Sequence, residues 1–68
     1  VHMTVSNLTK RRVMLDALIR LERIKKNTEG ILAQAFMCRD VSLLEECILI
    51  IDKIKIIQKL ITSILSNS

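Results

Sequence analysis

The sequence predicts an all-α fold, an antiparallel hairpin of two long helices. Leu, Ile, Lys, Glu and Arg dominate its 68 residues, with one Gly and no Pro, a composition typical of long helices and coiled coils. Two stretches, at about 8–37 and 43–65, repeat apolar residues at the spacing of one helix face. The segment between them, 38–41, is so short that the two helices must be antiparallel neighbours.

The second stretch is the more apolar of the two. It opens on Ser42 and Glu45, the pattern of a capping box, in which each side chain satisfies the backbone N–H of the other residue. A helix from here places seven residues on one seam: Leu44, Cys47, Ile51, Ile54, Gln58, Ile61 and Leu65. A row beside this seam holds Leu43, Ile50, Ile57 and Ile64, and the far side holds Leu49, Ile56 and Leu60. A helix that is apolar over most of its circumference is typically buried, and a chain this short has little with which to bury it.

A β-strand is the competing interpretation of the Ile-rich run. Residues 48–57 alternate in part and are rich in β-branched side chains. The length of the run, its capping box and the lack of a Gly, Pro or Asn turn signal favour the helix.

The first stretch has a narrower apolar face. Its seam is Met14, Leu18, Leu21, Lys25, Thr28, Leu32 and Ala35, and a second row holds Ala17, Ile24 and Ile31. The period continues across residues 27–30, which predicts one helix over about 8–37 with N-caps available at 4–7. A break at 27–30, giving three helices, is the alternative, because Gly30 weakens a helix by up to ~1 kcal/mol.

Residues 4–68 are expected to form a single domain, and Val1-His2-Met3 to be a cloning remnant. A secretory signal is not recognisable at the N-terminus. Acidic and basic residues interrupt 43–65, and each costs roughly 2.5–3.5 kcal/mol at the centre of a membrane helix. We therefore expect a cytoplasmic protein that does not insert into membranes.

Cys38 and Cys47 flank the expected turn. A disulfide between them is conceivable, but the simpler interpretation is two reduced thiols, with Cys47 on the seam. Two cysteines without a histidine beyond His2 do not make a zinc site, and neither a metal nor a cofactor is expected.

The charge is concentrated in the first half of the chain. Residues 1–39 hold eight basic and three acidic residues, against three and four in 40–68. We expect ion pairs between Asp16 and Arg20 and between Glu22 and Lys26. A basic face for nucleic acid could come from Arg11, Arg12, Arg20, Arg23 and Lys26. A solvated helix face is favoured, since no stacking aromatic accompanies these residues and acids lie among them.

A catalytic constellation is not recognisable in the sequence. The only adjacent carboxylates are Glu45 and Glu46, which point about 100° apart on a helix. We therefore expect a non-enzymatic, protein-binding function. Two other interpretations stay open, a small basic helical dimer associated with nucleic acid and a homo-oligomeric structural hairpin.

The chain resembles the small co-chaperones of type III secretion needle subunits, the YscE-like family. The resemblance covers roughly residues 8–65 and rests on the basic first helix at 11–26, the turn at 38–41 and the aliphatic second helix that opens Leu43-Leu44-Glu45. It implies a cytoplasmic hairpin that binds a tetratricopeptide-like chaperone, the pair keeping the needle subunit soluble before export. The net positive charge and the Ile content depart from the family pattern.

The residues expected to bind a partner are those of the second helix that point away from its seam. They are Leu49, Ile50, Ile56, Ile57, Leu60 and Ile64. Large apolar patches are rare on monomers, so we also expect the isolated chain to self-associate through this helix, as a dimer that closes a four-helix arrangement.

Overall fold

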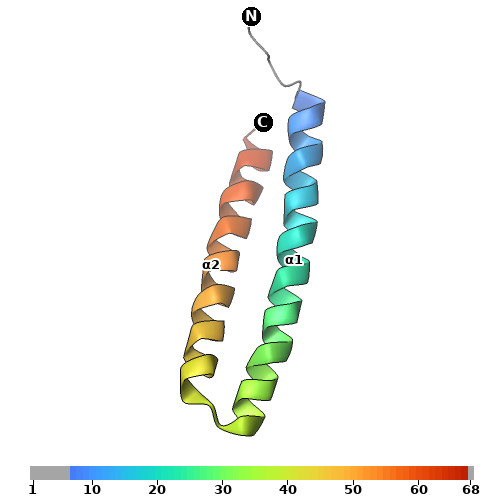
Figure 1. Cartoon of the computed structure of the whole chain (residues 1–68). Coiled ribbons are helices and arrows are strands. Elements are labelled where there is room, and N and C mark those ends of the chain that lie inside the picture. The colour runs from blue at the N-terminus through green and yellow to red at the C-terminus, as the bar shows by residue number, and fades with distance from the viewer. Residues whose placement is uncertain (1–6, 68) are drawn as a thin grey trace, which may run out of the picture.

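The computed structural model describes residues 7–67 and has two helices in this range, α1 (Asn7–Cys38) and α2 (Val41–Ser66). They run side by side in opposite directions and are joined at one end by a short turn (Figure 1). The predicted all-α hairpin is confirmed. The suspected remnant 1–3 and the expected caps at 4–6 lie outside the described residues, and Asn7 is the first residue of α1.

α1 is one continuous helix that passes through Gly30. The alternative of a break at 27–30 is therefore wrong, and so is the alternative of a strand at 48–57, which is helical throughout. A Cβ built at Gly30 meets nothing within 4 Å. Gly30 lies on the exposed side of α1, and the helix continues through it although glycine contributes no side chain.

The core is the seam that the apolar period predicts. The buried residues are Thr28 and Ala35 of α1 and Cys47, Ile51, Ile54 and Ile61 of α2. The other predicted seam residues are half-buried: Met14, Leu18, Leu21, Lys25, Leu32, Leu44, Gln58 and Leu65. Thr28 is satisfied within α1, since its hydroxyl donates to the carbonyl of Ile24 at 2.8 Å. Burial of one face of each helix therefore holds the hairpin together.

The turn consists of two residues. Arg39 has a φ of 56°, the left-handed conformation that glycine usually supplies at this position. Its N–H donates to the carbonyl of Phe36 at 3.2 Å, and the N–H of Asp40 donates to the carbonyl of Ala35 at 2.9 Å. These two bonds form a Schellman motif, which satisfies carbonyl groups left open at the end of α1.

Asp40 caps the start of α2. Its carboxylate accepts from the backbone N–H of Leu43 at 3.1 Å, and its own backbone is extended. The predicted cap at Ser42 with a capping box to Glu45 is wrong, because α2 begins at Val41 and Ser42 already lies inside the helix. The turn is shorter than the expected 38–41 because Asp40 serves both helices, closing α1 with its N–H and opening α2 with its side chain.

Candidate functional site

The middle of the seam carries a small polar cluster. Gln58 donates from Nε2 to Oε2 of Glu22 at 3.0 Å, and Nζ of Lys25 lies 3.1 Å from the same oxygen. The bonds from Gln58 and from Lys25 lower the pKa of the Glu22 carboxyl below its ordinary value. The cluster ties α1 to α2 at one height, so it also fixes which residues of the two helices lie opposite each other.

Of the two expected ion pairs on α1, one is present and the other is replaced by a pair with a different lysine. Arg20 binds Asp16 at 2.8 Å, as predicted. The predicted pair of Glu22 with Lys26 is wrong, since Glu22 contacts Lys25, whose side chain is half-buried. Exposed pairs of this kind contribute only a few tenths of a kcal/mol each.

The basic residues of α1 have mixed surroundings. Arg12, Arg23 and Lys26 are exposed. Arg20 is held by Asp16, and Nη1 of Arg11 donates to the backbone carbonyl of Leu65 at 3.2 Å. The bond from Arg11 places a positive charge at the C-terminal end of α2, where the helix dipole favours it. Part of the basic cluster therefore stabilises the hairpin itself.

The six residues expected to bind a partner are all exposed on α2. The exposed fraction is 56% for Leu49, 53% for Ile56 and 60% for Leu60, which form the outer ridge of the helix. The values are lower, 39–47%, for the row that flanks the seam, Ile50, Ile57 and Ile64. α2 thus has one side buried against α1 and another, equally aliphatic, that the described residues leave open.

α1 contributes exposed aliphatic residues that the partner prediction did not include. Ile24 and Ile31 are 49% and 44% exposed and lie seven residues apart beside the seam. Their seven-residue spacing is visible in the sequence. Their position relative to the rows of α2 depends on how the helices are paired, which the spacing does not give.

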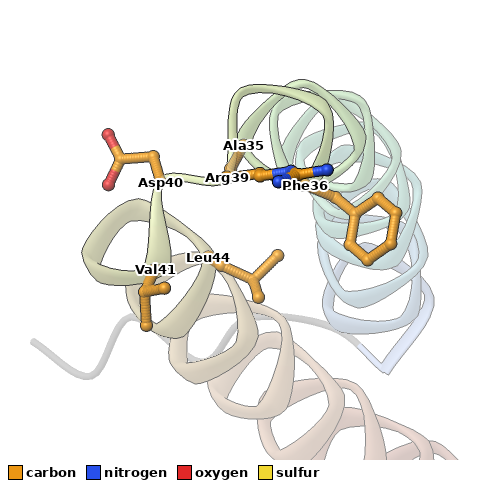
Figure 2. Close-up of a pocket in the computed structure, with 6 residues that line it drawn as sticks. All are labelled: Ala35, Phe36, Arg39, Asp40, Val41 and Leu44. Atoms are coloured by element: carbon orange, nitrogen blue, oxygen red, sulfur yellow. The ribbon is translucent and has the colours of Figure 1, made fainter.

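The turn end of the hairpin has two shallow hollows. The first, of about 350 Å³, is lined by Ala35, Phe36, Arg39, Asp40, Val41 and Leu44. Figure 2 shows Leu44 pointing between the two helices while the Asp40 carboxylate points away. The second, of about 430 Å³, is lined by Glu29, Leu32, Ala33, Phe36, Met37, Leu44 and Ile48. Periodicity did not single out this end, because Phe36 and Met37 sit outside the α1 seam.

Both cysteines are free. Cys47 is buried on the seam, as predicted, and Cys38 is exposed at the end of α1. Over residues 7–67 there is no group of three or more His, Cys, Asp or Glu side chains that could hold a metal ion. Within the same residues, neither helix combines the length and the apolar character needed to cross a membrane.

Comparison with protein-family models, with curated proteins and with solved structures finds no match for this chain.

Proposed function

We propose that this protein is a non-enzymatic binding partner of another helical protein, which covers the outward side of α2. The observation that carries the proposal is the exposure of six aliphatic side chains on one helix whose opposite side already forms the core. Contiguous apolar surface of this kind marks interaction sites. Because the residues recur at helical spacing, the partner is expected to receive α2 in a groove lined by apolar side chains.

The partner that the sequence resemblance suggests is a tetratricopeptide-like chaperone. In this proposal the pair keeps a type III secretion needle subunit soluble in the cytoplasm before export. The hairpin architecture and the open side of α2 support it, since a groove formed by stacked helices can accept a straight amphipathic helix. The outer ridge Leu49, Ile56 and Leu60 would supply the anchors furthest from the seam.

The test is co-expression with a tetratricopeptide-like chaperone from the native host. Wild type should form a stable complex, and Ile56→Asp and Leu60→Asp should lose it, because an unpaired buried charge costs about 3–5 kcal/mol. Both substitutions are at exposed positions, so helicity measured by circular dichroism should be retained.

Ile48→Asp is the matched control. Ile48 is the same residue type on the same helix and is 45% exposed, but it lies in the hollow on the other side, beside Phe36 and Met37. This variant should bind as wild type does. The proposal fails if wild type does not bind such a chaperone, and the surface is misassigned if Ile48→Asp weakens the complex as much as Ile56→Asp.

A further inference from the structure

One broad side of the hairpin is aliphatic over both helices. On α1, Ile24 comes directly before the seam residue Lys25, and Ile31 comes directly before the seam residue Leu32. On α2 the equivalent residues are Ile50, before Ile51, and Ile57, before Gln58. A right-handed helix turns clockwise when viewed from its N-terminus, so two antiparallel helices facing each other place equivalent positions on the same side of the hairpin.

The opposite side of the hairpin confirms this geometry. Residues just after a seam position should share that side, and Glu29 and Phe36 of α1 line one hollow together with Ile48 of α2. The Glu22 carboxylate, which also follows a seam position, takes its hydrogen bond from Gln58 on α2. Glu22 and Glu29 therefore lie on one side of the hairpin, and the rows of isoleucine lie on the other.

The rows of the two helices also lie at matching heights. The hydrogen bond between Glu22 and Gln58 places these two residues near each other across the helices. Ile24 lies two residues closer to the turn than Glu22 on α1, and Ile57 lies one residue closer to the turn than Gln58 on α2. Seven residues further toward the turn on each helix lead to Ile31 and Ile50. We call the resulting surface the aliphatic face, formed by Ile24, Ile31, Leu43, Ile50, Ile57 and Ile64, each 39–49% exposed.

We propose that the aliphatic face binds a second copy of this chain, so that two hairpins form a four-helix bundle. A helix that contacts one neighbour needs only the seam, whereas a helix in a bundle carries an additional apolar row beside it. Both helices carry that additional row on the same side, and the hairpin occupies only their seams. A flat face with equivalent rows on both helices can pair with itself about a two-fold axis.

The area of the face is what a dimer of this size needs. The row on α2 extends from Leu43 to Ile64, which is roughly 32 Å at 1.5 Å per residue. With the 22 Å width of the hairpin, this gives a surface on the order of 700 Å², close to the ~800 Å² that each partner contributes to a standard interface. The outer ridge Leu49, Ile56 and Leu60 lies outside the aliphatic face and stays accessible in the dimer. Ile50, Ile57 and Ile64 belong to both surfaces, so a second copy and the proposed partner would compete for that row.

Sedimentation equilibrium on the isolated chain tests this inference, which goes beyond the proposed function and does not depend on it. Wild type should be a dimer at tens of micromolar. Ile24→Asp and Ile57→Asp should weaken dimerisation more than about 100-fold, because each places two unpaired charges in the interface. Ile24→Gln, which keeps a good helix former without the charge, should shift the equilibrium in the same direction.

Ile19→Asp is the matched control, since Ile19 is 59% exposed on α1 but lies away from the aliphatic face. It should dimerise as wild type does. The melting temperature of wild type should rise with protein concentration over roughly 5–200 µM, which tests the dimer even if a variant unfolds. A wild-type monomer at high micromolar concentration, an assembly other than a dimer, or equal effects of Ile19→Asp and Ile24→Asp would overturn the inference.

Discussion

Ile54 and Ile56 stand two residues apart on α2, yet they occupy opposite environments. Ile54 is 5% exposed against α1, and Ile56 is 53% exposed on the outer ridge. The same residue type therefore serves two purposes on one helix. On the seam it supplies the apolar burial that holds the hairpin together, and on the ridge it supplies apolar surface that the hairpin does not use. Composition alone would misjudge α2 as a fully buried helix, whereas position separates the side that packs against α1 from the side that stays exposed.

The largest expected effect separates these two sides by stability. Ile51→Ala should destabilise the hairpin by about 2–5 kcal/mol, because it leaves a cavity in the seam. Leu49→Ala, at a position 56% exposed, should cost less than about 1 kcal/mol. Urea denaturation at one fixed protein concentration measures both. Similar losses for the two variants would mean that the outer ridge is also part of the core.

The next effect concerns the turn that holds the two helices together. Asp40→Ala should destabilise by about 0.5–2 kcal/mol, since the backbone N–H of Leu43 loses its acceptor. Ser42→Ala, within the first turn of α2, should leave the melting temperature nearly unchanged. Thermal melting followed by circular dichroism distinguishes them, and the reverse order of effects would return the cap to Ser42.

A smaller effect is expected on the exposed side of α1. Gly30→Ala should stabilise the hairpin by up to about 1 kcal/mol, because alanine is the better helix former and its Cβ meets open space at this position. Urea denaturation measures the gain. A loss of stability would show that the side around Gly30 is in contact with another chain in solution.

The smallest effect comes from the polar cluster of the seam. The folded-state pKa of Glu22 is lowered, so its stabilising contribution is complete above its ordinary pKa, near 4.5, and is lost as the pH falls through the lower folded value. As the pH falls below about 4.5, Glu22→Gln should therefore lose stability less steeply than wild type. Denaturation at a series of pH values measures the slopes, with Glu29→Gln as control. Identical slopes for wild type and Glu22→Gln would contradict the role of this carboxylate.

Much of this arrangement could be predicted from the sequence. The seam from Met14 to Leu65 follows from apolar spacing, because only one side of each helix can face the other. The start of α2 could not be predicted in the same way, since Asp40 and Ser42 are both good caps. The choice between them depends on the left-handed backbone of Arg39. Glycine usually marks this conformation in a sequence, and here an arginine stands in its place.

The partners of polar side chains depend on the pairing of the helices. Lys25 and Lys26 follow Glu22 at three and four residues, so the spacing allows an ion pair with either. In the structure Glu22 accepts a hydrogen bond from Gln58 of α2 and pairs with Lys25. Prediction of the aliphatic face also requires the relative position of the two helices along their axes. Each row is visible in the sequence, but only the hydrogen bond between Glu22 and Gln58 indicates that Ile24 and Ile57 lie at similar heights.

Thiol accessibility tests most directly whether α2 has one side for folding and one for binding. In a Cys38→Ser background, Cys47 reports on the seam and Ile56→Cys reports on the outer ridge. We expect the introduced thiol to be alkylated rapidly in the isolated chain and slowly in complex with the proposed tetratricopeptide-like partner, whereas Cys47 stays slow in both. An introduced thiol that is as slow as Cys47 without the chaperone, or equally fast with it, would contradict this division of α2.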